Sequence, residues 1–409
     1  MPRRLLPALV AALGLAACTD ASHAPTAPDA ARMRASTEAT EARATGAARV
    51  TAAALWNQRT RAIIGRRGGS SNHAARLYAL VSVAQYNAVI AAEAAKARGV
   101  QPSEAGAAAA AAAAVLAARY PSEQDFVETE LAADAAYFAT LPAERHADFA
   151  AGAAVGRSVA AAVLARAASD GSDVVWTGTI PVGPGYWTSA SPTTPPQEPL
   201  WGTIRPWILA SADQFRPLPP PTFGSPEFLA ALAEVRHLSD TRTPEQLRIA
   251  QFWASGYGAG GPAGYFGSVA VELAGRQHLD ERATAHLLAV MHTAIMDASI
   301  ACYEAKYAYW YIRPHQADPA ITIPVNRPNF PAYPSAHSCL SAGAAGVLAA
   351  VFPSRAVELH AMVEEAGVSR LYAGLHFRFD VTAGRELGFA VAELALRQAP
   401  NGHRPIPLD

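Results

Sequence analysis

Two cationic side chains bracket an aromatic segment, Lys306-Tyr-Ala-Tyr-Trp-Tyr-Ile-Arg313, which Pro314 follows directly. Seven residues make two helical turns, so a helix would point Lys306 and Arg313 from one face. Pro314 disfavours helix at Arg313 and places it at the helix end. Two such cations repel each other unless an anion lies between them, so the segment predicts an anion site or, alternatively, a solvated helix end. Arginine supplies almost all positive charge in this chain, and Lys306 therefore indicates that a compact point charge is needed.

A second group of polar residues lies in Phe330-Pro-Ala-Tyr-Pro334-Ser335-Ala336-His337. Pro334 is typical of a helix start, where free N–H groups and the positive end of the helix dipole attract an oxyanion. The hydroxyl and amide of Ser335 would reach that anion, and the small side chain of Ala336 would let the backbone approach it. His337 would add a titratable imidazole. Taken alone, the same residues also fit an ordinary helix cap.

The third group contains Arg370, Gly374, His376 and Asp380. His376 and Asp380 are four residues apart, so the carboxylate can accept a hydrogen bond from one imidazole nitrogen. That contact fixes the tautomer and leaves the other nitrogen as a nucleophile or metal ligand. Gly374 permits a bend that would turn Arg370 towards His376. The alternative is an ordinary helical His–Asp pair.

Other motifs carry less chemistry. The run from Gly256 to Gly261 matches GxGxxG, but it follows a helical pattern and precedes Pro262, so a loop between helices is favoured over a dinucleotide site. No HExxH motif or Cys/His cluster has the spacing of zinc ligands. His286 and His292 lie in an apolar helical pattern that is typical of core histidines.

In order and spacing, the three groups resemble the signature KxxxxxxRP, PSGH and SRxxxxxHxxxD. That signature belongs to the superfamily of type-2 phosphatidic acid phosphatases and vanadium-dependent haloperoxidases. One position departs from it, since Ala336 stands where the family usually has glycine. The family uses the backbone N–H of that residue, which alanine retains, so the site should survive if the φ of Ala336 is negative.

The resemblance implies a role for each matching residue. Lys306, Arg313 and Arg370 would neutralise the oxygens of vanadate or phosphate. Ser335 and the amide of Ala336 would add hydrogen bonds to the same group. His376 would be the vanadium ligand or the nucleophile that forms phosphohistidine. Asp380 would orient His376, and His337 would be the acid–base group.

Two activities follow from the resemblance, and the motifs do not separate them because vanadate and phosphate need the same donors. The long helical segment before the motifs is similar to the bacterial haloperoxidase branch, which favours oxidation of a halide by hydrogen peroxide, with vanadate as cofactor and a small organic substrate. The alternative is an acid phosphatase without a cofactor, which would act on phosphate monoesters. A binding protein without catalysis is disfavoured by the intact His376–Asp380 pair. Phe330 would line the halide or substrate pocket, and an aromatic residue there is similar to the chloroperoxidase type.

Composition and periodicity predict the elements that must position these residues. A net charge of −1 does not provide the positive electrostatic field that a nucleic-acid-binding protein needs. Because 51% of the residues are hydrophobic, the chain can form a large core. Apolar spacing predicts helices at about 74–95, 103–119, 123–138, 143–169, 226–238, 243–255, 263–276, 279–311, 338–352, 354–372 and 376–398. Prolines and tryptophans between Asp170 and about Ser225 predict a long ordered loop packed on the helices. We therefore expect an all-α fold of two packed helical bundles that share one core, with no strand and no transmembrane helix.

The N-terminus predicts export. Arg3 and Arg4 precede a short apolar stretch that ends in Leu-Ala-Ala-Cys18, which resembles a bacterial lipobox; an ordinary signal peptide cut nearby is the alternative. We expect a lipoprotein signal peptide at residues 1–18, a flexible tether at 19–48 and one all-α domain at 49–409, with the motifs in a core at about 279–400. A lipid on Cys18 would be the only membrane attachment, in a bacterial cell envelope, with the domain in the periplasm or outside the membrane. Cys302 and Cys339 could pair, although two buried thiols are favoured.

Overall fold

The computed structural model describes residues 50–96, 98–99, 101–142, 146–191, 193–399 and 402–408. The predicted signal peptide, the tether and the lipidation site Cys18 lie outside these residues and stay predictions. Within them, the predicted all-α fold is confirmed, because the regular elements are helices and the only β-type pairs are two isolated bridges.

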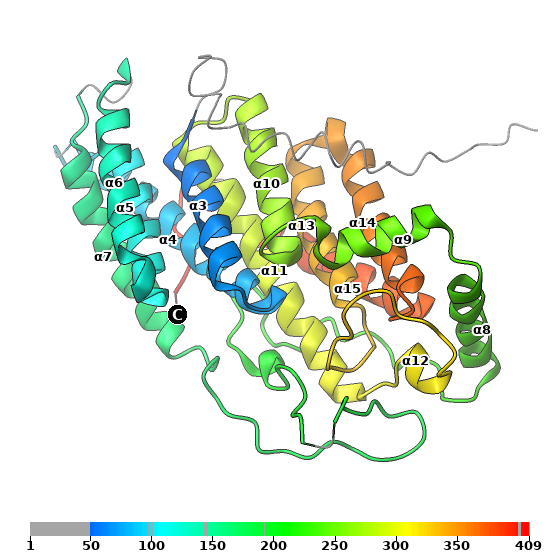
Figure 1. Ribbon diagram of the computed structural model, residues 1–409. Coiled ribbons are helices and arrows are strands. Elements are labelled where there is room, and N and C mark those ends of the chain that lie inside the picture. The colour runs from blue at the N-terminus through cyan, green and yellow to red at the C-terminus, as the bar shows by residue number, and fades with distance from the viewer. Residues whose placement is uncertain are drawn as a thin grey trace, which may run out of the picture.

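The first half of the chain forms one group of helices, and the second half forms another (Figure 1). The first group comprises α3 (Ala52–Arg67), α4 (Ser71–Lys96), α5 (Glu104–Arg119), α6 (Gln124–Phe138) and α7 (Phe149–Ala168). The second comprises α8 (Pro226–Asp240), α9 (Pro244–Gln251), the π-helical turn η5 (Phe252–Gly256), α10 (Gly261–Arg276), α11 (Glu281–Tyr309), α12 (Pro314–Ala317), α13 (Ala336–Val351), α14 (Ala356–Tyr372) and α15 (Arg378–Gln398). Helix α11 packs on α4 in one direction and on α13 in the other, and one hydrophobic core runs through both groups.

Side chains at the helix starts explain why several helices begin where they do. Thr51, Ser103, Asp148, Ser225 and Asp280 each accept a hydrogen bond from a backbone N–H in the first turn of the helix that follows. Such caps satisfy amides that have no partner within the helix. The starts capped by Ser103, Ser225 and Asp280 lie within two residues of the predicted ones. Helix α7 begins six residues later than predicted, and α3 was not given a predicted range.

Small residues let the helices of the first group pack closely. A Cβ atom built on Gly152 or Gly156 of α7 would lie 2.2 Å from a backbone oxygen of Ser103 or Ala107. The alanine-rich α5 can therefore bury almost its whole length against α7. Its alanines serve helix-to-helix packing in the core.

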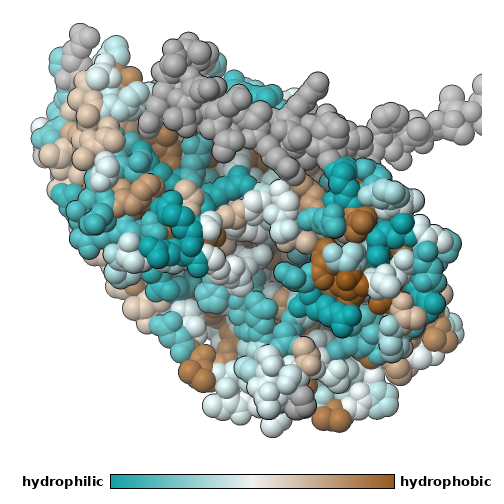
Figure 2. Space-filling model, viewed as in Figure 1, coloured by the Kyte–Doolittle hydropathy of each residue, from teal (hydrophilic) through white to brown (hydrophobic). Residues whose placement is uncertain are grey.

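Among the described residues, three helices are long and apolar enough to cross a membrane, whereas the prediction was that the chain has no transmembrane helix. In each of these helices the most apolar stretch is 18 residues long. The buried share of that stretch is 94% in α11 and 78% in α4, but only 33% in α7. For α4 and α11 the apolar composition thus reflects packing against other helices. Figure 2 shows a face on which hydrophilic and hydrophobic residues are mixed, with the hydrophobic ones in small patches.

The loop between α7 and α8 is ordered along α11, as predicted, and has one short 3-10 turn at Trp201–Thr203 (η4). It runs below the helices in Figure 1. The buried carboxylate of Asp297 on α11 accepts hydrogen bonds from the consecutive amides of Trp207, Ile208 and Leu209, at 2.7–3.1 Å. Gly202 lies directly on α11, since a Cβ there would be 2.6 Å from the Cα of Glu304.

Candidate oxyanion-binding active site

Lys306 lies in the last turn of α11 and is fully buried. Its ammonium group donates to the carbonyl oxygens of Pro331, Ala332 and Pro334, two of them at 3.0 and 2.7 Å. These three bonds use all the donors of an ammonium group. Lys306 therefore holds the segment that precedes α13 and brings its positive charge to the start of that helix.

The spacing predicted that Arg313 lies two helical turns after Lys306 on the same face of one helix, and this prediction is wrong. Helix α11 ends at Tyr309 because Trp310 adopts a left-handed conformation, with φ of 49°, and Arg313 lies at the start of the short helix α12. The chain bends at Trp310, and the guanidinium of Arg313 reaches the site from beyond the end of α11. Nε and Nη2 donate to the carbonyl of Phe330 at 3.0 and 2.9 Å, and Nη1 donates to Leu375 at 2.9 Å.

His376 and Asp380 are in contact, but not along a helix. Helix α15 begins only at Arg378, and its third residue, Asp380, accepts hydrogen bonds at 3.0 Å from the amide of Phe377 and at 2.9 Å from Nδ1 of His376. The helical i,i+4 interpretation was therefore wrong in its geometry and correct in its pairing. Gly374, with φ of 70°, makes the turn that precedes His376.

The hydrogen bonds of His376 define its tautomer. Nη1 of Arg313 lies 3.2 Å from Nε2 of His376, and an arginine nitrogen can only donate. Nε2 must then accept, so the proton is on Nδ1 and points to Asp380. The lone pair of Nε2 consequently faces a buried cation, where an anion would also be attracted.

The start of α13 lies beside this pair because α13 and α15 pack closely. A Cβ on Gly384 or Gly388 of α15 would lie 2.6 Å from the carbonyl of Ser335 or 2.2 Å from that of Cys339. The amide of Ser335 donates to the carbonyl of Asp380 at 2.9 Å and is therefore engaged, whereas its buried hydroxyl has no hydrogen-bond partner within the described structure. Ala336 is the first residue of α13, so its φ is not positive, and its amide has no acceptor within the helix.

The remaining predicted residues complete one cluster. Arg370, near the end of α14, donates to Ser369 Oγ at 2.9 Å and to the carbonyl of Ala250 at 2.8 Å. Nε2 of His337 lies 2.8 Å from the carbonyl oxygen of Trp253. The ring of Phe330 is 5.1 Å from Nζ of Lys306 and 5.0 Å from the guanidinium carbon of Arg313.

Burial dominates the electrostatics of this cluster. Lys306, Arg313 and Arg370 are at most 3% exposed, and burial lowers their pKa values to about 8, 10 and 10. Burial, together with neighbouring cations, lowers the pKa of His337 to about 3 and that of His376 well below its ordinary value. Burial raises the pKa of Asp380 to about 7, against the influence of Lys306 and Arg313.

These residues fit an oxyanion. Lys306, Arg313 and Arg370 are buried, and Asp380 is the carboxylate that acts on the first two. Buried charge without enough counter-charge is costly. The unpartnered hydroxyl of Ser335 and the helix-start amide of Ala336 are further donors. Among the described residues, no group of three His, Cys, Asp or Glu side chains could hold a metal cation. A tetrahedral anion such as phosphate or vanadate would supply the missing negative charge and could accept hydrogen bonds from Ser335 and Ala336.

The motifs did not reveal the backbone carbonyls of Ala250, Trp253, Phe330 and Leu375, which hold the site residues. A carbonyl has no side-chain signature, so motifs built from residue types could not reveal these contacts. The run from Gly256 to Gly261 connects the turn η5 to α10 and has no strand before it, so a connection between helices is confirmed. Cys302 and Cys339 are buried free thiols.

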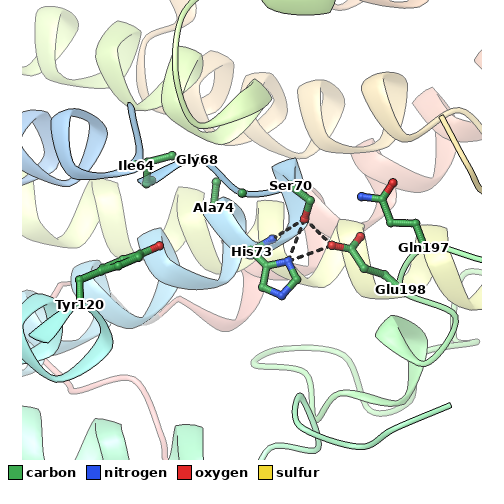
Figure 3. A pocket seen from close by; sticks show the side chains of 9 residues that line it. Ile64, Gly68, Ser70, His73, Ala74, Tyr120, Gln197 and Glu198 are labelled. Atoms are coloured by element: carbon green, nitrogen blue, oxygen red, sulfur yellow. Dashed lines mark hydrogen bonds and ion pairs between the residues drawn. The ribbon is translucent and has the colours of Figure 1, made fainter. Parts of the chain in front are cut away.

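Two cavities lie outside this cluster, and neither is lined by a predicted site residue. One, of about 430 Å³, lies where α3 meets α4 (Figure 3). Its polar groups bind each other, since Glu198 accepts from Asn72 at 2.7 Å and contacts Ser70 and His73. The other, of about 590 Å³, lies between α8 and α15.

Part of the chain matches a known protein family. The sequence model of the PAP2 superfamily matches residues 283–404, the segment that contains all three motifs. No curated protein matches the chain significantly. The resemblance to the superfamily of phosphatases and vanadium haloperoxidases is thus confirmed.

The whole fold is similar to solved vanadium-dependent peroxidases. A bacterial vanadium-dependent iodoperoxidase superposes with a TM-score of 0.73 at 23% identity, over 86% of this chain and 97% of that one. The apo and holo forms of a bacterial vanadium-dependent chloroperoxidase give TM-scores of 0.66 and 0.65 at 13% and 14% identity. They cover 80% and 82% of this chain and 94% and 93% of theirs. The likeness extends over the first group of helices as well as the motif-bearing half.

Proposed function

We propose that the protein is a vanadium-dependent haloperoxidase-type enzyme that oxidises a halide with hydrogen peroxide. The observation that carries the proposal is the lone pair of His376 Nε2, which faces Arg313 in a cluster of buried cations while Asp380 holds the proton on Nδ1. The fold of the structural neighbours supports the same activity over a phosphatase.

The donors divide the work in this proposal. Lys306, Arg313 and Arg370 would balance the charge of vanadate, which His376 would bind. Ser335 and the amide of Ala336 would donate to its oxygens. When bound, vanadate supplies the activation of hydrogen peroxide towards a halide. His337 would transfer a proton, and Phe330 would border the halide or organic substrate.

A second activity is supported by the PAP2 match. An acid phosphatase would use the same cations to bind a phosphate monoester, and Nε2 of His376 would attack phosphorus. The leaving alcohol would take a proton from His337 in the form that also carries a proton on Nδ1. Water would then release phosphate from the phosphohistidine.

One experiment separates the two activities. The purified protein, loaded with orthovanadate, is assayed for peroxide-dependent bromination and chlorination, and the protein without vanadate is assayed for phosphate release from an aryl phosphate. We expect halogenation that depends on vanadate and falls by at least about 100-fold in His376→Ala. Absence of halogenation, together with phosphate release that His376→Ala abolishes, would replace the first proposal with the second.

A further inference from the structure

We propose that the π-helical turn η5 and Glu365 of α14 are a positioning element for His337. They hold its imidazole as the tautomer with the proton on Nε2 and leave Nδ1 as the basic nitrogen. The inference rests on the proposed function only in giving His337 a proton to transfer.

The tautomer follows from one contact. Nε2 of His337 is 2.8 Å from the carbonyl oxygen of Trp253, and a carbonyl oxygen can only accept. Nε2 therefore carries a proton. Burial and Arg370 disfavour the doubly protonated ring, so the neutral form has its lone pair on Nδ1. His376 has the opposite arrangement, with the proton on Nδ1.

The π-helical geometry makes the Trp253 carbonyl available. In a continuing α-helix this oxygen would accept from the amide of Tyr257, and in a continuing π-helix from that of Gly258. Neither happens, because Tyr257 donates to Phe252 and Gly258 donates to Ser255. The chain leaves the turn at Gly258, whose φ is 88°.

Side chains from other helices hold the turn in place. The indole N–H of Trp253 donates to Oε1 of Glu365 at 2.9 Å. The Trp253 ring also packs against Phe252, Tyr257 and Tyr265 at centroid distances of 5.4–5.6 Å. Because one residue supplies both the carbonyl for His337 and the indole for Glu365, loss of the Glu365 acceptor would let the turn shift relative to His337.

The same stretch of chain also contacts the anion site through Arg370, which donates to the carbonyl of Ala250 at 2.8 Å. The end of α9 and the turn η5 thus present two carbonyls to two residues of the predicted site. Carbonyls at a helix C-terminus carry the negative end of the helix dipole, which favours these N–H donors.

The first test reads the tautomer directly and needs no activity. Long-range ¹H–¹⁵N spectra of the full-length protein with ¹⁵N-labelled histidine report which nitrogen is protonated, and His337→Gln identifies the signal of His337. We expect the Nε2–H pattern in the wild type and a mixture of tautomers in Glu365→Leu. Glu365→Gln keeps an acceptor for the indole and should retain the wild-type pattern. An Nδ1–H pattern in the wild type, or an unchanged pattern in Glu365→Leu, would overturn the inference.

The second test measures turnover in whichever assay above gives activity. We expect Glu365→Leu to lower kcat by about 10-fold with KM changed less than about twofold, as for other residues that orient a site histidine. Glu365→Gln should restore kcat. Glu358→Leu is the matched control, since Glu358 pairs with Arg355 at the other end of α14. An equal loss in Glu358→Leu would contradict a positioning role, whereas absence of both activities would count against the proposed function and leave the spectra decisive.

Discussion

Individual side chains in the site combine strong positive charge with little room for water. Lys306 and Arg313 are fully buried, and the carboxylate of Asp380 acts to raise the pKa of both. Lys306 and Arg313 donate hydrogen bonds to backbone carbonyl oxygens, which do not neutralise their positive charge. Affinity for an anion should therefore depend on how many of these groups are protonated.

We expect sulfate, a tetrahedral dianion that does not itself titrate in this range, to bind more tightly as the pH falls from about 9 to about 6. Burial places the pKa of Lys306 at about 8 and that of Asp380 at about 7, so a lower pH adds positive charge at the first and removes negative charge at the second. Each proton taken up on binding contributes a slope of up to about tenfold per pH unit. Isothermal titration calorimetry across this range measures the slope.

The two lysines of the chain provide a matched pair of controls. Lys306→Met should weaken sulfate binding and flatten its dependence near pH 8. Lys96→Met should change neither, because Lys96 forms a part-exposed pair with Glu104 at 2.7 Å between α4 and α5. Sulfate affinity that is independent of pH in the wild-type protein would contradict the assignment of these charges to the site.

At the scale of elements, close packing of α13 on α15 sets the distance between Ser335 and the His376–Asp380 pair. We expect Gly388→Ala to separate these helices, because the added Cβ would meet a backbone oxygen that cannot move independently. Overpacking of this kind costs about 1–3 kcal/mol. Both the thermal midpoint and the affinity for sulfate should fall.

Gly275→Ala is the control for that substitution. Gly275 lies in α10, and a Cβ added there would meet nothing within 4 Å, so alanine should be neutral or stabilising. Differential scanning calorimetry compares the two variants. Equal midpoints would show that the predicted clash is relieved elsewhere.

The long loop depends on α11 through Asp297. We expect Asp297→Ala to leave three buried amides without an acceptor and to loosen the segment around Trp207. Hydrogen–deuterium exchange should rise locally at residues 205–212 while α13 and α15 stay protected. Unchanged exchange there would mean that packing of the tryptophans holds the loop without this carboxylate.

At the scale of the whole molecule, the two helical groups share one core, and α11 contributes to both the loop anchor and the site. We therefore expect a mutation in α11 that lowers stability to affect the loop, the site and both groups of helices. Attachment to a membrane belongs to the N-terminal segment in our proposal, and it can be tested apart from the enzyme.

We propose that Cys18 is acylated in a bacterial envelope, because it ends a short apolar stretch in a lipobox-like context. Metabolic labelling with a fatty acid in a bacterial host should mark the wild-type protein and not Cys18→Ser. The variant should also move from the detergent phase to the aqueous phase in Triton X-114 partition. Labelling that persists in Cys18→Ser would refute the lipobox.

The helices and the three motifs could be predicted because their signals are local. Apolar spacing and the order of Lys306, Ser335 and His376 are both written in side-chain identity. Those signals were sufficient for the all-α class and for the identity of the residues that now lie in one cluster.

Tertiary structure alone decided how these residues meet. The left-handed Trp310 takes Arg313 off α11, the late start of α15 leaves His376 outside the helix, and the π-helical turn frees the Trp253 carbonyl. Each outcome depends on the residue at which the regular backbone hydrogen bonds of a helix stop. It also depends on which distant segment supplies a partner for the backbone groups that are left free there. Backbone carbonyls have the same chemistry at every residue, so no residue type announces in advance which of them will hold a cation or an imidazole.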